Sequence, residues 1–149
     1  MIEAIWKKGT DDLTDAFSLR REVFIGEQGI PEELEFEGDD VEYRHLVVYD
    51  DGEPAASGRM RFLTNEEAKI GRICVRKASR GKQIGYFLVK VMMEKAFDEG
   101  ALTMVVDAQV QAEPFYRICG FKRVCEIEDP TGIPHCRMQA DLIRIFTGE

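Results

Sequence analysis

The sequence predicts an α/β (α+β) fold: a mixed, mostly antiparallel sheet of six to seven strands, helices on both faces and a central parallel βαβ unit. Residues 68–75 and 102–107 are β-branched runs that flank a long apolar-periodic segment ending before Gly100. Such a crossover places its two strands parallel in one sheet. The segments before it are separated by tight turns, which is typical of an antiparallel meander.

The chain opens with a strand and a helix. Residues 2–6 alternate in hydrophobicity and predict a short first strand. Either Thr10 or Asp11 is placed to cap a helix that runs to Phe24, because its apolar residues fall three and four apart. A glycine within 26–29 is expected to end this helix.

Three antiparallel strands should follow, over residues 45–49, 55–62 and 68–75. The Asp-Asp-Gly-Glu sequence at 50–53 is a strong hairpin signal, and residues 65–67 form the second turn. This meander leads directly into the crossover unit.

The last part of the chain predicts a short helix and two strands. Pro114 suits a first helical turn and Gly120 suits a C-cap. Residues 122–127 and 134–142 are expected to pair as the closing strands, joined by a turn at 129–132.

Length and charge limit the possible functions. The chain has 149 residues, enough for one domain over 1–149 that buries roughly two thirds of its unfolded surface. A net charge of −8 argues against a nucleic-acid partner, since that affinity depends on neutralising phosphates. The charged N-terminal segment is too short for a signal sequence or a membrane span, so we expect a cytoplasmic protein without a membrane partner.

The four cysteines follow no metal-ligand spacing, and we expect neither a metal site nor disulfides. Cys74 and Cys125 lie in apolar stretches and are expected to be small core residues. This usage is consistent with a reducing compartment.

A basic loop before the long central helix is the strongest functional feature. Its cations are Arg76, Lys77, Arg80 and Lys82. Helix N-termini favour anions, so each cation there costs roughly 0.3–1 kcal/mol. Gly81 and Gly85 would let a phosphate approach the backbone. The loop is therefore either an anion site completed by a ligand or a solvated basic turn, and the acidic background favours the anion site.

Residues 32–42 contain seven acidic side chains. One interpretation is a solvated, mobile face, which is usual for a run of like charge. The other is an acidic rim that attracts a cationic acceptor and mainly raises its association rate.

Two segments on either side of the crossover carry a family resemblance. Arg80-Gly81-Lys82-Gln83-Ile84-Gly85 and Phe115-Tyr116-Arg117-Ile118-Cys119-Gly120-Phe121 resemble the two signatures of the GNAT superfamily of acyl-CoA-dependent N-acyltransferases. Gln83 departs from the first signature, because it takes the place of a glycine. Segments 20–29, 108–109 and 133–138 resemble the ElaA-like and YjcF-like branch. The resemblance covers essentially the whole chain and implies a GNAT-type fold.

The resemblance also implies acetyl-CoA as the cofactor, with the CoA pyrophosphate as the anion. The residues expected to bind it are Ile73, Cys74, Val75, Arg80, Gly81, Lys82, Gln83, Ile84, Gly85, Gln109 and Phe115. In relatives the loop N–H groups hold the pyrophosphate. The resemblance further implies that the strand at 73–75 splays from the strand at 103–107 and bonds the pantetheine arm and the thioester carbonyl, a form of strand addition.

The implied chemistry is direct attack of an amine on a thioester. Tyr116 matches the family's general acid, although a tyrosine that only packs beside Phe115 is the alternative. For the general base, Glu27 and His135 are candidates. A water relay is equally compatible with the sequence, and a lone histidine on a strand is often just a packed residue.

Three functions therefore compete. The first is an N-acetyltransferase acting on a primary amine of a small molecule or peptide, as a monomer or homodimer. The second is a non-catalytic acyl-CoA sensor, and the third is an acyl-homoserine-lactone synthase with a similar fold. A nucleotide P-loop is excluded, because Gly-Lys-Gln at 81–83 lacks the Ser or Thr that binds magnesium.

Overall fold

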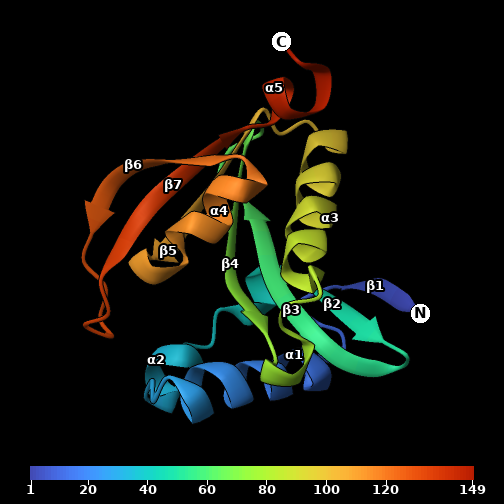
Figure 1. Cartoon of the computed structure of the whole chain (residues 1–149), viewed down its shortest axis with the longest axis vertical. Helices are drawn as coiled ribbons and strands as arrows, with labels where there is room; N and C mark the ends of the chain where they lie inside the picture. The colour runs from blue at the N-terminus through green and yellow to red at the C-terminus, as the bar shows by residue number, and fades with distance from the viewer.

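One seven-stranded sheet organises the chain, and the computed structural model describes all residues, 1–149. Its spatial order is β1-β2-β3-β4-β5-β7-β6 (Figure 1). The strands are β1 (Ile2–Lys7), β2 (Arg44–Asp50), β3 (Glu53–Phe62), β4 (Glu67–Val75), β5 (Thr103–Gln109), β6 (Phe121–Ile127) and β7 (His135–Asp141). The predicted fold class, the meander and the closing pair of strands are confirmed.

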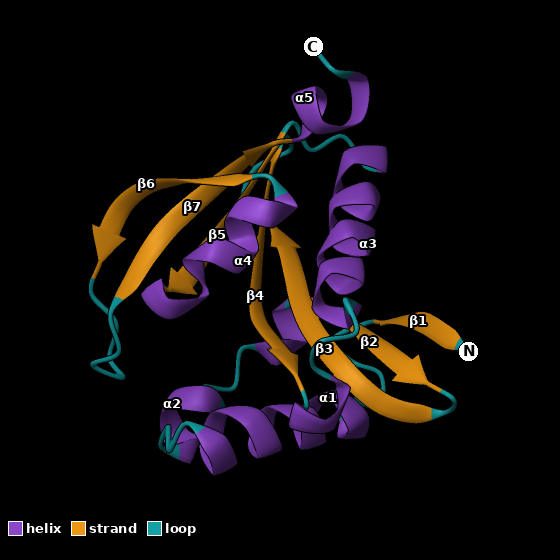
Figure 2. Ribbon diagram, viewed as in Figure 1, coloured by secondary structure: helices purple, strands orange, loops and turns teal.

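Helices occupy both faces of this sheet, as predicted (Figure 2). The longer ones are α1 (Thr14–Arg20), the π-helix η1 (Arg21–Glu27), α3 (Ile84–Asp98), α4 (Glu113–Cys119) and α5 (Leu142–Thr147). Single turns are α2 (Glu32–Glu35), η2 (Asp40–Glu42), η3 (Lys77–Ser79) and η4 (Val110–Ala112). None of these helices combines the length and apolar character that crossing a membrane requires.

The core has two parts because strand side chains alternate between faces. Leu46 and Val48 of β2 join the larger cluster with α3 and α4, whereas Val47 between them joins the smaller cluster with α1. From α3, Leu88 and Met92 are fully buried against the sheet. The sheet is therefore a middle layer whose centre is fixed from both sides.

The parallel pair β4–β5 forms as predicted but is short. Residues 67–70 pair with 103–106, and the pairing stops there although both strands continue. Arg72 adopts positive φ (50°), and the β3–β4 register shifts between Ser57 and Arg59. This bulge bends β4 away from β5, and the two strands diverge at the centre of the sheet (Figure 1).

The first helix ends where it was predicted to, since η1 stops at Glu27 just before Gly29 with its positive φ, but its start differs. It begins at Thr14 rather than at Thr10 or Asp11, and the Asp12 carboxylate accepts the Thr14 N–H at 3.0 Å. Apolar periodicity does not mark this start. The residues just before it form a separate turn, in which the Lys8 N–H donates to the Asp11 carboxylate at 2.7 Å. The π geometry of η1 was not predicted; π turns are frequent at functional sites.

Near the end of the chain, one helix was not predicted and one expectation was wrong. The last strand ends at Asp141, whose side chain accepts the Arg144 N–H and caps α5, a helix that was not predicted. Cys125 is exposed rather than in the core, because it lies on the edge strand β6. Cys74 is buried, as expected.

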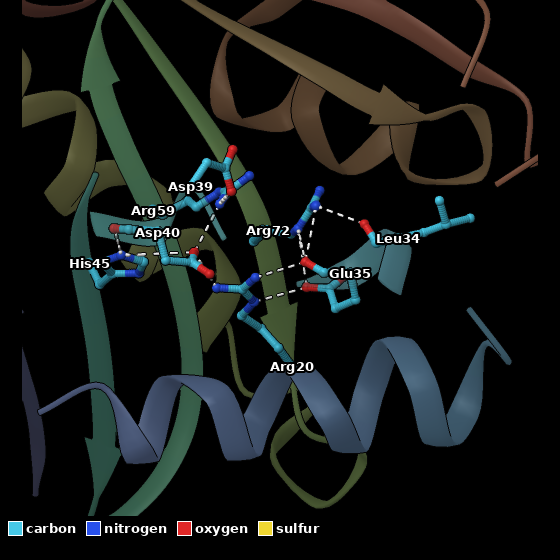
Figure 3. A network of polar contacts seen from close by, with 8 residues as sticks. All are labelled: Arg20, Leu34, Glu35, Asp39, Asp40, His45, Arg59 and Arg72. Atoms are coloured by element: carbon cyan, nitrogen blue, oxygen red, sulfur yellow. Dashed lines mark hydrogen bonds and ion pairs between the residues drawn. The ribbon is translucent and has the colours of Figure 1, made fainter. Parts of the chain in front are cut away.

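The acidic segment 32–42 is not simply a solvated face. Glu35 and Asp40 are buried on either side of the Arg20 guanidinium (Figure 3). Arg20 donates from Nε to the Glu35 carboxylate at 2.8 Å and from Nη1 to Asp40 at 2.6 Å. Arg59 also donates to Asp40, and Arg72 pairs with Glu35 at 3.1 Å. This set of residues is called the buried ion network below.

Burial and pairing act against each other in this network. Burial raises the pKa of Glu35 despite its arginine partners. Burial also acts to raise the pKa of Asp40, but the Arg20 hydrogen bond and the charges of Arg20 and Arg59 outweigh it, so the pKa is lowered. His45, whose Nε2 lies 2.9 Å from the Asp40 carbonyl oxygen, has a pKa lowered by burial. A neutral His45 therefore completes the network.

Removing Arg20 should be far more costly than removing its neighbour. Arg20→Ala leaves two buried carboxylates without their shared partner, so we expect the free energy of unfolding to fall by about 3–5 kcal/mol. Arg21→Ala removes an exposed pair with Glu32, which is worth about 0–1 kcal/mol. Urea denaturation of both variants measures the difference. Equal losses of unfolding free energy in the two variants would mean that the buried ion network is worth no more than an exposed ion pair.

Candidate active site

The divergence of β4 and β5 opens a cavity of about 890 Å³. It brings together nine of the residues that the sequence nominated, namely Glu27, Ile73, Cys74, Val75, Arg80, Gln109, Phe115, Tyr116 and His135. They come from η1, β4, the loop before α3, β5, α4 and β7. Residues more than 100 positions apart in the chain therefore share one cavity.

A second cavity of about 440 Å³ lies at the start of α3. Its lining includes Gly81, Gln83, Ile84 and Gly85. Val75, Arg80 and Phe115 line both cavities, so the two adjoin. Lys82, also predicted to bind the cofactor, lines neither cavity.

The loop before α3 presents a row of free backbone donors. Among the backbone hydrogen bonds, none is donated by the N–H groups of residues 81–86, and no side chain accepts from them. The first amide of this segment to find an acceptor is that of Phe87, which donates to the Gln83 carbonyl at 3.0 Å. Six consecutive donors at the positive end of a helix dipole form an anion-binding surface.

Two residues shape this row of amides. Gln83 has φ 61° and ψ 18°, the left-handed conformation that costs a non-glycine residue roughly 1–2 kcal/mol. The substituted signature position therefore does require positive φ. At Gly85 an added Cβ would lie 3.1 Å from the Val75 side chain and 3.4 Å from the Phe115 ring, so any larger residue would press on two side chains that line both cavities.

Arg80 and Lys82, two of the basic side chains of the loop, have partners in the chain. Arg80 donates from Nε to the Val75 carbonyl at 3.0 Å and from Nη2 to Glu27 at 2.8 Å. Lys82 lies 3.9 Å from Asp50 and is mostly exposed. These contacts hold Arg80 between the loop and η1, and they also pair the candidate base Glu27.

Tyr116 both packs and reaches the cavity. Its ring meets Phe115 and Phe121 edge-on, at centroid distances of 5.0 and 5.6 Å. Its hydroxyl has no hydrogen-bond partner in the chain but is not enclosed, so it is open to the cavity. Burial raises the pKa of Tyr116 well above its ordinary value, so the phenol stays protonated at neutral pH.

The His135 ring is held by a hydrogen bond to a backbone carbonyl. Its Nδ1 lies 2.6 Å from the Ile133 carbonyl oxygen, and its Nε2 lies 3.8 Å from the Asp129 carboxylate. Because a carbonyl only accepts, Nδ1 carries the proton in the neutral ring and Nε2 keeps a lone pair. The histidine is thus well packed and still has one nitrogen able to accept a proton.

Gln109 bridges two walls of the cavity. Its Nε2 donates to Gln28 Oε1 at 2.7 Å, and its Oε1 accepts from Gln111 at 2.7 Å. The bridge ties the end of η1 to the end of β5. Gln28 and Gln111 were not singled out in the sequence.

Glu35, Arg72 and Asp129 also line the larger cavity, although none of them was individually predicted to be a site residue. Glu35 was hidden in a run of acidic residues, and Asp129 was assigned only to a turn. For Arg72 the sequence offers no signal, since nothing marks a non-glycine residue that will adopt positive φ.

The chain is similar in sequence to proteins of one known family. A sequence model described as the Acetyltransferase (GNAT) family matches residues 10–121. The chain belongs to the GNAT acetyltransferase family. In sequence it is 38% identical over 141 residues to YjcF of Bacillus subtilis (strain 168), described as an uncharacterized N-acetyltransferase; the match spans 94% of this chain and 100% of YjcF.

Solved structures of GNAT relatives share the fold closely. ElaA of Escherichia coli superposes with a TM-score of 0.81 at 28% identity, covering 95% of this chain and 100% of ElaA. An acyl-CoA N-acyltransferase from Pseudomonas aeruginosa gives a TM-score of 0.80 at 27% identity, covering 94% and 99%. These similarities confirm the ElaA-like and YjcF-like resemblance of the sequence.

The strained turn of this GNAT loop should respond oppositely to glycine at adjacent positions. Gln83→Gly relieves a left-handed residue and should raise the free energy of unfolding by about 0.5–1 kcal/mol. Lys82 has no positive φ, so Lys82→Gly should lower it by a similar amount. Urea denaturation of the ligand-free variants measures both. A loss of stability in Gln83→Gly would contradict the strained loop geometry.

Proposed function

We propose that this GNAT protein transfers an acetyl group from acetyl-CoA to a primary amine of a small molecule or peptide. Acetyl-CoA is the general donor of the family. The observation that carries the proposal is the row of six free amides at 81–86, which adjoins the cavity containing the open Tyr116 hydroxyl. An anion site and a protonated acid thus lie on one continuous surface.

The residues present fit CoA. The loop amides would hold the pyrophosphate, with charge added by Arg80 and Lys82. Beyond Ile70 the edge of β4 is not paired with β5, so residues 73–75 are available for strand addition by the pantetheine arm. Gln109 and Phe115 would contact the cofactor from β5 and α4.

When bound, acetyl-CoA supplies the acyl group as an activated thioester. The amine nitrogen would bond to the carbonyl carbon and lose a proton, and the carbon–sulfur bond would break to release the CoA thiolate. The Tyr116 phenol would donate its proton to the departing sulfur, and its raised pKa keeps that proton in place at neutral pH.

Two side chains are placed to take the proton of the amine. His135 has Nε2 free to accept, and Glu27 lies on the same cavity but is paired with Arg80. A diphosphate bound beside Arg80 would compete with Glu27 for the guanidinium, which would release the carboxylate. A water relay needs neither side chain.

Substituting the proposed acid should slow turnover without weakening cofactor binding. We expect Tyr116→Phe to lower kcat by about 10²-fold, the usual contribution of a general acid. The assay is thiol release from acetyl-CoA over a panel of amines, with CoA affinity measured by calorimetry. Tyr43→Phe is the control, because Tyr43 is also buried but packs on Arg59 away from both cavities. Wild-type rates in Tyr116→Phe would remove this residue from the mechanism.

Reversing one loop charge should weaken CoA binding. We expect Lys82→Glu to raise the Kd for CoA by about three- to tenfold, and the effect should shrink in high salt because Lys82 is exposed. Lys122→Glu makes the same charge change on the edge strand β6 and should leave the Kd unaltered. Binding of 3′-dephospho-CoA measures the contribution of the 3′-phosphate. Unchanged CoA affinity in Lys82→Glu would contradict the role of the basic loop.

The pairing of Glu27 with Arg80 also favours a second candidate, a non-catalytic acyl-CoA sensor. Tight CoA binding without turnover of any amine would support it. Using S-adenosylmethionine as the acceptor in the same assay tests the acyl-homoserine-lactone synthase alternative.

A further inference from the structure

We infer that the acceptor is an amine with a second positive charge, of the diamine class, whose distal ammonium is bound by Glu35 and Asp129. This inference rests on the proposed function and concerns the end of the larger cavity formed by α2 and the β6–β7 hairpin. None of the residues that carry it belongs to the proposed cofactor site.

The larger cavity is lined by more carboxylates than cations. Its acidic residues are Glu27, Glu35, Glu37, Asp107 and Asp129, whereas its only lysine or arginine side chains are Arg72 and Arg80. A substrate with a carboxylate would need a free cation here. A substrate with an additional ammonium would need a free carboxylate.

Both arginines that line the larger cavity already have partners in the chain. Arg72 donates to the Leu34 and Glu35 carbonyls at 3.1–3.3 Å and pairs with the Glu35 carboxylate. Arg80 is held by Val75 and Glu27 at the cofactor end. Asp107 is satisfied from outside the site, by Lys69 at 3.2 Å and Arg137 at 2.8 Å. No cation is left to bind an acidic substrate.

Glu35 supplies an observation independent of this charge count. The residue is 3% exposed, and its Oε2 accepts from Arg20 and lies 3.1 Å from Arg72 Nε. Its other oxygen, Oε1, has no hydrogen-bond partner in the chain and is not enclosed. A largely buried carboxylate oxygen without a donor is costly. An ammonium at Oε1 would supply that donor and favour the ionised form against burial.

Asp129 is a cavity carboxylate that no lysine or arginine side chain pairs with. Its Oδ2 accepts from the Thr131 N–H at 3.0 Å and from the Thr131 hydroxyl, which fixes the side chain in the hairpin. Its Oδ1 faces His135 Nε2 at 3.8 Å, and no lysine or arginine pairs with it. Both carboxylates are therefore positioned by the protein, so a ligand would not have to order them on binding.

Three acceptors of matched length test the inference. They are 1,5-diaminopentane, pentylamine and 5-aminopentanoate, which end in an ammonium, a methyl group and a carboxylate. We expect kcat/KM to fall in that order, by about tenfold at each step. A value for 5-aminopentanoate equal to or above that of the diamine would overturn the inference.

Two substitutions locate the effect. Asp129→Asn keeps an oxygen for Thr131, and Glu35→Gln keeps the shape of the side chain; each should raise KM for the diamine about three- to tenfold more than it raises KM for pentylamine. Glu42→Gln, an exposed acid outside the cavity, should change neither. If Glu35→Gln fails to fold, the test rests on Asp129→Asn. An Asp129→Asn variant that prefers the diamine as strongly as the wild type would contradict the inference.

The outcomes separate this inference from the proposed function. Turnover of all three amines at equal rates would sustain the acetyltransferase and refute the diamine site. If no amine is acetylated, the proposed function fails, and calorimetric titration of the CoA-saturated protein with the same three compounds ranks their affinities. Diamine binding no tighter than pentylamine binding would then refute the inference as well.

Discussion

The early end of the β4–β5 pairing is the feature on which the rest of the site depends. Four residue pairs hold the parallel strands together, and the positive φ of Arg72 then turns β4 aside. A continuous parallel sheet would have closed the space that the larger cavity occupies. Strain at one residue is thus linked to the opening of the centre of the sheet.

The buried ion network holds this bend in place. Arg72 donates hydrogen bonds to the Leu34 and Glu35 carbonyls, and the Glu35 carboxylate accepts a hydrogen bond from Arg20 (Figure 3). Buried ion pairs are expensive to desolvate and contribute little net stability compared with well-packed apolar residues. Their effect here is positional, because they dock the acidic segment against β4 and make it a wall of the cavity.

The cavity has two electrostatic ends. The loop before α3 combines free amides with basic side chains at the smaller cavity, while the charged lining of the larger cavity is mostly carboxylate. Arg80 lies between them, since it reaches the Val75 carbonyl and the Glu27 carboxylate at once. An anionic cofactor and a cationic acceptor would therefore be drawn to different ends of one surface.

The sequence by itself determined the fold class, the order of the strands along the chain, the central crossover and the two GNAT signatures. These follow from local periodicity and turn chemistry, which act over a few neighbouring residues. It also nominated nine of the residues that line the larger cavity. It placed the start of the first helix too early, and it missed the π-helix and α5.

Only the tertiary structure decided which charges are buried and what they pair with. Glu35 and Glu37 are two positions apart and equally acidic in the sequence, yet one is buried beside Arg20 and the other is exposed. Likewise, the positive φ of Gln83 and of Arg72 appears only in the folded chain. Such outcomes depend on contacts between residues far apart in the chain, and local sequence patterns carry no record of those contacts.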